Sequence, residues 1–406
     1  MPNDVAHPVL HVTELILQFT SYLHNSIKTK DIDSASMVCK SWYEPVMDIK
    51  WKTAFLRPLL STLAPLRISQ DGEWEFDSPP TRDDWTRFHK VARRVSILER
   101  AELWRFTDAL LEVLRMGSHS ISGLVPNLQR LEIIDTDPEA ILGILGIFPS
   151  TLDQLIISTL GTSQTLEQTQ LLQSISFRFT QLSRFDIQGF GDTEECHNAL
   201  ATMLSQLKDL RSVNLHGQSP STEVISVAAR LPSLRILKIR GLSITEGDGL
   251  EWKPSVGVFP KLLQLDLQSN LDKFTALLIA DIAVGEDSER YRQNHSLNEL
   301  FLDHRKHITL APAFPEVIRA ISLHFSLRQL RLDAVKVETL VIAALEPLKA
   351  CTALQSLKLD IQALTLEVTD GEVDKLLDHL PSLEILYLTL SAWGIESSCL
   401  IQRSRP

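Results

Sequence analysis

The sequence predicts an elongated α/β protein in which a unit of one strand and one helix is repeated along the chain after a small helical module. Three observations support this. A Leu-x-x-Leu-x-Leu frame, with other apolar residues at some positions, recurs ten times from residue 128 to 388. Apolar residues at i, i+3 and i+4 follow many of the frames. A proline-containing break at residues 57–80 separates the repeats from an amphipathic N-terminal stretch.

The frame is clearest where Leu128, Leu131 and Ile133 are aligned with Leu234, Leu237 and Ile239. The other eight copies begin at Leu152, Leu182, Leu210, Leu262, Leu297, Leu327, Leu354 and Leu383. The starts lie on average about 28 residues apart, and the pattern resembles the leucine-rich repeat family, whose period is about 20 to 29 residues. The resemblance implies a horseshoe, with a parallel sheet on its concave face and helices on its convex face.

The repeats are expected to form a solenoid over residues 95–392, with a C-terminal cap or tail at 393–406. Helical spacing between frames predicts helices at residues 102–116, 193–206, 222–230, 313–323, 337–349 and 372–380. The turn position three residues after each frame commonly holds Asn or Cys in the family, and here only Asn270 fits. We therefore expect an irregular solenoid. Residues 57–94 are predicted to be a linker and helical connection, with one helix near residues 83–91.

The N-terminal stretch has the pattern of short amphipathic helices. Leu15, Ile16, Phe19 and Leu23 share one face of a helix at residues 14–23. Asp31 is a suitable N-cap for a second helix reaching Trp42, and a third helix is expected over residues 43–55. Helices this short cannot bury their apolar faces alone. The module is therefore expected to pack its helices together or to dock on a partner.

The order Glu14-Leu15-Ile16, Leu23, Asp31-Ile32, Val38-Cys39-Lys40-Ser41-Trp42 and Trp51 resembles the F-box family, although Val12 stands where that family usually has proline. The resemblance covers about 42 positions, and it implies a three-helix module at residues 7–56 that binds a Skp-type adaptor and, through it, a cullin scaffold. The implied adaptor contacts are Leu10, Val12, Leu15, Ile16, Phe19, Ile32, Val38 and Trp42. The alternative is that several of these residues form only the core of a small helical domain.

Composition and charge narrow the functional classes. The formal net charge of -11 argues against general nucleic-acid binding, which requires a basic surface. The start of the chain lacks the pattern of a secretory signal, and no apolar run approaches the ~20 residues of a membrane span. The four cysteines have neither disulfide-framework nor zinc-site spacing. By elimination, we expect a cytoplasmic or nuclear protein without membrane association.

Residues that flank the inward leucines point to the concave face, because side chains alternate along a strand. This mixed set of charged and aromatic side chains suits a polar protein target. The target-binding candidates are Asp186, His216, Lys238, Arg240, Asp266, Phe301, Arg331, Lys358 and Tyr387. A solvated sheet face would also need polar residues, so each of them has a second explanation.

No pattern of catalytic, cofactor-binding or metal-ligating residues is apparent. The sequence lacks glycine-rich phosphate loops and nucleophile elbows, and His304 and His307 have no neighbours at ligand spacing. Together with this absence, the resemblance to the F-box and leucine-rich repeat families implies a non-catalytic subunit of a Skp-cullin-F-box ubiquitin ligase that recruits a protein target. The alternative is an interaction scaffold that acts outside any ligase.

Overall fold

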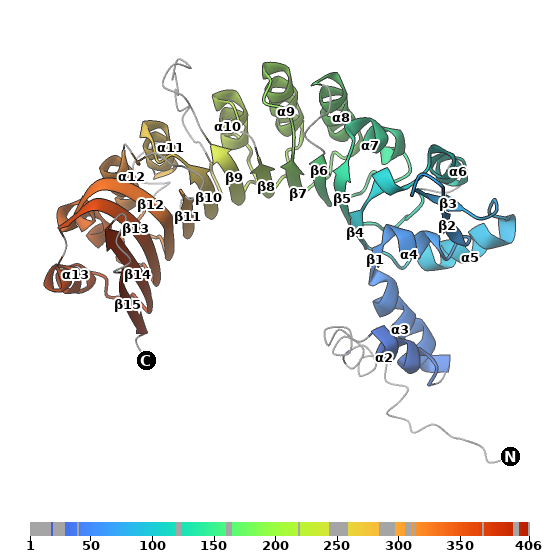
Figure 1. The fold of residues 1–406 in the computed structure, drawn as a ribbon, viewed down its shortest axis with the longest axis horizontal. Coiled ribbons are helices and arrows are strands. Elements are labelled where there is room, and N and C mark those ends of the chain that lie inside the picture. Colours follow the sequence, from blue (N-terminus) through green and yellow to red (C-terminus); the bar gives the residue numbers. More distant parts are fainter. Residues whose placement is uncertain are drawn as a thin grey trace, which may run out of the picture. The chain divides into compact units, whose positions relative to one another are not determined.

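The computed structural model describes residues 18, 29–38, 40–118, 123–159, 165–217, 220–242, 259–283, 297–304, 310–311, 313–367, 369–392 and 398–404. The chain divides into two compact units, Met1–Ser163 and Gln164–Pro406. Each unit carries parallel strands on one face, here called the strand face, and helices on the other (Figure 1). The predicted helix at residues 14–23 lies almost wholly outside the described residues.

Unit 1 contains a parallel sheet and a small antiparallel hairpin. The sheet runs in the order β1 (Thr53–Phe55), β4 (Ile97–Ala101), β5 (Arg130–Thr136) and β6 (Gln154–Thr159). The hairpin pairs β2 (Leu66–Ile68) with β3 (Trp74–Phe76). The helices are α2 (Thr29–Ser36), α3 (Lys40–Lys52), α4 (Leu56–Leu60), α5 (Arg82–Ala92), α6 (Asp108–Ser118) and α7 (Pro138–Leu145), with a 3₁₀ turn at Leu103–Arg105.

Unit 2 continues the alternation of strands and helices. Its parallel strands are β7 (Arg184–Gln188), β8 (Ser212–His216), β9 (Ile236–Leu242), β10 (Gln264–Ser269), β11 (Glu299–Asp303), β12 (Gln329–Val341), β13 (Ser356–Glu367) and β14 (Ile385–Ala392). An antiparallel strand, β15 (Ser398–Ser404), closes the C-terminal edge. The helices are α8 (Thr165–Arg178), α9 (Glu194–Gln206), α10 (Thr222–Ala229), α11 (Lys273–Ala283), α12 (Phe314–Ser322) and α13 (Asp370–Leu377), with 3₁₀ turns at Ile342–Ala344 and Glu346–Ala350.

The predicted frames coincide with the ten strands from β5 to β14. All thirty residues of these frames are buried, the most exposed being Leu383 at 8%. Their alternation places apolar side chains between the sheet and the helices and leaves polar neighbours on the strand face. The prediction of a repeated α/β solenoid with a long parallel sheet is therefore confirmed.

Local sequence signals start several of the helices. Thr193 and Ser221 lie just before α9 and α10, and each side-chain oxygen accepts a hydrogen bond from a backbone N–H three residues later. Thr81 and Asp84 form a capping box at α5. Asp137 caps α7, where Pro138 fills the first helical position. These caps satisfy N–H groups that the first helical turn leaves without intrahelical partners.

The predicted helix at residues 337–349 is wrong, because β12 continues through Val341 and is followed by 3₁₀ turns. Val335, Val337, Thr339 and Val341 place β-branched side chains at every second position, which favours a strand. Val335 and Val337 are buried, and they pair with Ile361 and Ala363 of β13. This repeat therefore has a longer strand at residues that the apolar spacing also allows to be helical.

The N-terminal end of the sheet also differs from expectation. Residues 53–55, predicted to end the third helix of the module, form β1 and pair with Ile97, Leu98 and Glu99. The segment at residues 57–94 contains α4, a hairpin and the predicted α5. The sheet thus begins before residue 95. The functional boundaries of the domains stay a prediction.

A left-handed residue follows the frame in several repeats. Asp135, Gly189, Gly217, Gly241 and Ala334 all have positive φ, and each lies two residues after the last apolar residue of its frame. The strand register shifts around three of these positions, as expected of a β-bulge. At Asp135, Gly241 and Ala334 the strand continues beyond the left-handed residue, so this conformation marks an irregularity within the sheet.

The packing of α12 on α11 includes a buried histidine that should make stability depend on pH. His324 lies 2.9 Å from the Ile279 carbonyl oxygen through Nε2. Burial lowers its pKa from 6.5, although the hydrogen bond to Ile279 works in the opposite direction. The unfolded chain therefore binds more protons just below pH 6.5, so this contribution to stability is complete above that pH and is lost as pH falls.

We expect the free energy of unfolding to fall between pH 7 and pH 5, with at most about 1.4 kcal/mol per pH unit from this residue. His324→Gln retains a donor for the carbonyl and should flatten the profile, measured by urea unfolding at each pH. His89, whose pKa burial also lowers, should leave a residual slope. A profile that is unchanged by His324→Gln would contradict the assignment.

Candidate functional site: a polar hollow on the strand face

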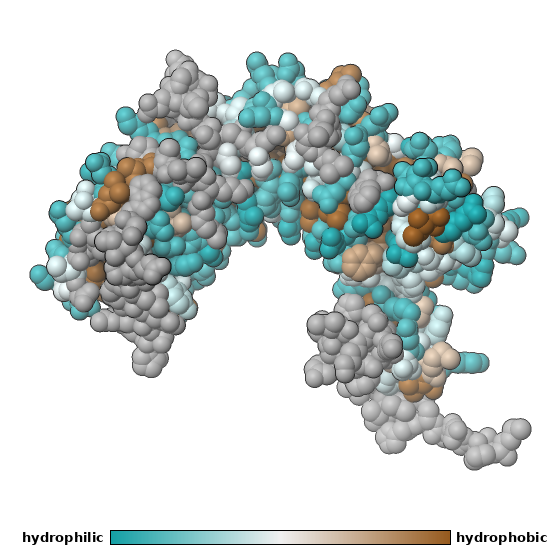
Figure 2. Space-filling model, viewed as in Figure 1, coloured by the Kyte–Doolittle hydropathy of each residue, from teal (hydrophilic) through white to brown (hydrophobic). Residues whose placement is uncertain are grey.

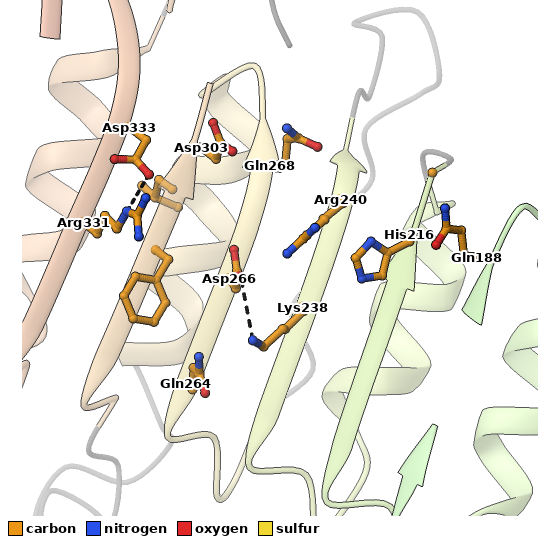
Figure 3. Close-up of a pocket in the computed structure, with 13 residues that line it drawn as sticks. Gln188, His216, Lys238, Arg240, Gln264, Asp266, Gln268, Asp303, Arg331 and Asp333 are labelled. Carbon is orange, nitrogen blue, oxygen red and sulfur yellow. Dashed lines mark hydrogen bonds and ion pairs between the residues drawn. The ribbon is translucent and has the colours of Figure 1, made fainter. Parts of the chain in front are cut away.

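The strand face of unit 2 carries a hollow of about 760 Å³ that spans strands β7 to β12 (Figure 3). The strand side of this unit is mainly hydrophilic in the view of Figure 2. The side chains that line the hollow come from Gln188, His216, Lys238, Arg240, Gln264, Asp266, Gln268, Phe301, Asp303, Arg331 and Asp333.

Strand register arranges these side chains in two rows. The first row runs across the sheet in the order Asp186, Asn214, Lys238, Asp266, Phe301, Arg331, Lys358 and Tyr387. The second row lies two residues further along each strand, in the order Gln188, His216, Arg240, Gln268, Asp303 and Asp333. Adjacent parallel strands lie about 4.8 Å apart, so each side chain faces its neighbours in the row.

Charges are distributed unevenly across the hollow. Asp333 is 5% exposed and forms ion pairs with two cations. One is Arg331 on the same strand, β12. The other is Lys358 on β13, whose Nζ lies 2.9 Å from the Asp333 Oδ1. On the other side, His216, Lys238 and Arg240 bring basic groups together on β8 and β9 (Figure 3). Among the described residues, Arg240 has no ion-pair partner.

Asp266 lies between these two regions. Its carboxylate is 3.9 Å from the Lys238 Nζ, a weak contact for an ion pair. Burial raises the pKa of Asp266 and Asp303 raises it further, whereas Lys238, Arg240 and Arg331 lower it. Burial therefore outweighs the attraction of the nearby cations, and the ionised carboxylate is held at a cost in stability.

Asp266→Asn should therefore raise the free energy of unfolding at pH 7 by about 0.5 to 1 kcal/mol. Because the folded-state pKa is raised, the wild-type contribution is lost as pH rises, and the benefit of the substitution should vanish near pH 3.8 and below. Urea unfolding at several pH values tests this, with the exposed Asp209→Asn as control. A destabilised Asp266→Asn variant at pH 7 would show that the contact with Lys238 dominates.

Six of the nine predicted target-binding residues line the hollow: His216, Lys238, Arg240, Asp266, Phe301 and Arg331. Lys358 borders it through Asp333. Tyr387 is 41% exposed and continues the first row on β14. Asp186 is 6% exposed and paired with Arg184 at 2.6 Å, which makes it a poor anchor for a partner. Whether these residues bind a target stays a prediction.

The hollow also contains residues that were not among the candidates. Gln188, Gln264, Gln268, Asp303 and Asp333 share the outward alternation of their strands. The alternation along each strand therefore identifies outward residues of the second row as well as of the first. Their convergence on one hollow depends on the register between strands, which one sequence does not specify.

The predicted adaptor contacts are only partly within the described residues. Leu10, Val12, Leu15, Ile16 and Phe19 lie outside them, as does the side chain of Ile32 on α2. Val38 is 56% exposed and therefore accessible. Trp42 is buried at 9% exposure and packs within α3, and its contact with an adaptor stays a prediction. Met37 and Tyr43, which were not candidates, are exposed beside them.

Comparisons with known proteins give little beyond the fold. No protein-family model and no curated protein matches the chain. Among solved structures, it is similar to the plant peptide hormone receptor RGFR1 in complex with RGF2, at 14% identity and a TM-score of 0.31. The alignment covers 81% of this chain and 52% of the receptor, so the chain spans about half the length of that protein.

The structure is an α/β solenoid of repeated strand and helix units, like that of leucine-rich repeats, with a polar hollow on its strand face. Within the described residues, no group of three or more His, Cys, Asp or Glu side chains is arranged to hold a metal ion. None of the described helices combines the length and apolar character needed to cross a membrane.

Proposed function

We propose that this protein is the substrate-recognition subunit of a Skp-cullin-F-box type ubiquitin ligase. Its N-terminal module docks on a Skp-type adaptor, and the strand face of the repeats binds a protein target. The chain itself contributes binding and proximity: it raises the effective concentration of target lysines near a ubiquitin-charged enzyme on the same scaffold.

The observation that carries the proposal is the exposure of three apolar side chains, Met37, Val38 and Tyr43. These side chains are 83%, 56% and 44% exposed, and they lie within the stretch that resembles an F-box. Figure 2 shows hydrophobic surface on the described part of this module. Large apolar side chains exposed within one short stretch are typical of a surface that another protein covers.

The module is also joined closely to the repeats of unit 1. Lys50 of α3 pairs with Asp33 of α2, which holds the two helices together. Arg94, just after α5, pairs with Glu44 and Asp48 of α3 and donates a hydrogen bond to the Glu44 carbonyl oxygen at 3.2 Å. A bound adaptor would therefore be held close to the beginning of the sheet.

Binding of the full chain to a purified Skp-type adaptor tests the proposal, measured by isothermal titration calorimetry. A Met37→Asp, Val38→Asp double variant should lose at least about 100-fold in affinity, because two exposed apolar anchors become charged. Phe325→Asp, at a residue that is 60% exposed in unit 2, is the matched control and should bind like the wild type. A wild-type chain that does not bind the adaptor would refute the docking proposal.

The alternative is an interaction scaffold outside a ligase, and it is favoured by the mixed charge of the hollow, which suits a protein partner whatever its fate. A reconstituted ubiquitin-transfer assay with a captured partner distinguishes the two. Ubiquitin transfer that is lost in the Met37→Asp, Val38→Asp variant supports the ligase role. A partner that binds through the hollow without ubiquitin transfer supports the scaffold.

A further inference from the structure

Unit 1 carries a second hollow, of about 490 Å³, which the proposed function does not use. It lies where β1 and α4 meet β3 and the chain that follows β4. The side chains that matter for its chemistry are Phe55, Arg57, Trp74, Arg100, Glu102 and Arg105. All belong to the same compact unit.

The hollow is basic, although the chain as a whole has a formal charge of -11. Three arginines and one glutamate line it, a net charge of +2 from three positive charges and one negative charge. Arg105 pairs with Glu102 at 2.7 Å. Within the described part of the chain, neither Arg57 nor Arg100 has a carboxylate partner. These two guanidinium groups are therefore available to an incoming anion.

Aromatic side chains accompany the two unpaired arginines. The Arg57 guanidinium lies over the Trp74 ring, 3.8 Å from its centroid, which fixes one cation in place. Phe55 is 50% exposed, a large apolar side chain at the edge of the hollow. Arginine and aromatic residues together are enriched at the anchor points of protein interfaces.

Arg100 adds a backbone observation. Its φ is 48°, in the left-handed region, where a residue other than glycine costs roughly 1 to 2 kcal/mol. It lies at the register shift of β4, and the bulges of several later strands place Gly241, Asp135 or Ala334 in the same conformation. A long cationic side chain at such a position sacrifices stability that glycine would recover. Strain of this kind is often found at binding sites.

We propose that this hollow binds an acidic segment of a partner protein that carries an aromatic or aliphatic side chain. The carboxylates would meet Arg57 and Arg100, and the apolar side chain would lie against Phe55 and Trp74. The charge complementarity and the exposed aromatic edge define the partner's chemistry. The inference does not depend on adaptor docking or on the strand-face hollow of unit 2.

Fluorescence anisotropy of the full chain with a labelled Glu-Glu-Phe-Glu-Glu peptide tests this inference. Saturable binding that weakens as salt is raised is expected, and Gln-Gln-Phe-Gln-Gln should not bind. Arg57→Gln and Arg100→Gly should each reduce affinity about tenfold. Arg82→Gln, an exposed arginine on α5, is the matched control and should bind like the wild type.

Arg100→Gly also separates binding from folding, because it should raise the thermal midpoint of unfolding while it weakens binding. A purely structural arginine would not give that combination. Equal affinities for wild type, Arg57→Gln and Arg100→Gly would overturn the proposal, as would the absence of saturable binding up to millimolar peptide. Stronger displacement by a short single-stranded oligonucleotide than by unlabelled acidic peptide would overturn it in favour of a nucleic acid.

Discussion

Phe179→Ala should lower the free energy of unfolding by about 3 to 5 kcal/mol, the range for removing a large aromatic side chain from a packed core. Phe179 follows α8 and is fully buried at 0% exposure. Its backbone N–H donates to the Ile175 carbonyl oxygen at 2.9 Å, which holds the ring under the end of the helix. Alanine would leave a cavity that the neighbouring strands cannot fill without distortion.

The chain provides a matched control two residues away. Phe177 is 89% exposed, so Phe177→Ala should change stability by no more than about 0.5 kcal/mol. Both variants remove the same atoms from the same turn of chain, and only burial differs. Urea unfolding followed by circular dichroism gives the comparison. Similar losses in the two variants would contradict the prediction that burial of Phe179 stabilises this repeat.

Gly123→Ala should destabilise unit 1 by about 2 to 4 kcal/mol, because two penalties act together. Gly123 has a φ of 95°, which disfavours any residue with a Cβ atom. A Cβ atom there would also lie 3.0 Å from the Ile147 carbonyl oxygen. That oxygen accepts a hydrogen bond from the Leu124 N–H at 2.7 Å, so it cannot move away without weakening this bond.

Two other glycines in unit 1 separate the penalties. Gly72 has a φ of 84° but nothing within 4 Å of a Cβ position, so Gly72→Ala should cost only the backbone term, about 1 to 2 kcal/mol. Gly146 lies in the right-handed region with open space around it, and Gly146→Ala should be nearly neutral. Thermal unfolding of the three variants should rank them in that order. A cost for Gly123→Ala no larger than for Gly72→Ala would exclude crowding at Ile147.

The strands of the solenoid were predictable because every frame residue is apolar and is buried between the sheet and the helices. The helices were less so. The sequence of α8 alternates apolar residues with Gln, Thr and Ser, and two of its polar residues, Gln168 and Ser176, are buried. Gln168 accepts hydrogen bonds from the Gly191 N–H at 2.6 Å and the Cys196 thiol at 3.2 Å. Tertiary partners of this kind hide the periodicity that identifies a helix.

The candidate site was predictable as a face but not as a hollow. Alternation along one strand identified Lys238, Asp266 and Arg331 as outward residues. It could not show that Asp333 pairs with both Arg331 and Lys358, because Lys358 belongs to the next repeat. Contacts between neighbouring strands decide which charged side chains are paired and which are not. Charge composition alone therefore says little about which groups on such a face remain available to a partner.

The direct junction of α3 and β1 has a mechanical consequence. Lys52 ends the helix and Thr53 begins the strand, so no flexible residue lies between the module and the first strand of its unit. A force applied to α3 would reach β1 through the chain itself, and unit 1 also through the ion pairs of Arg94 with Glu44 and Asp48. A partner that pulls on the module would therefore also pull on β1.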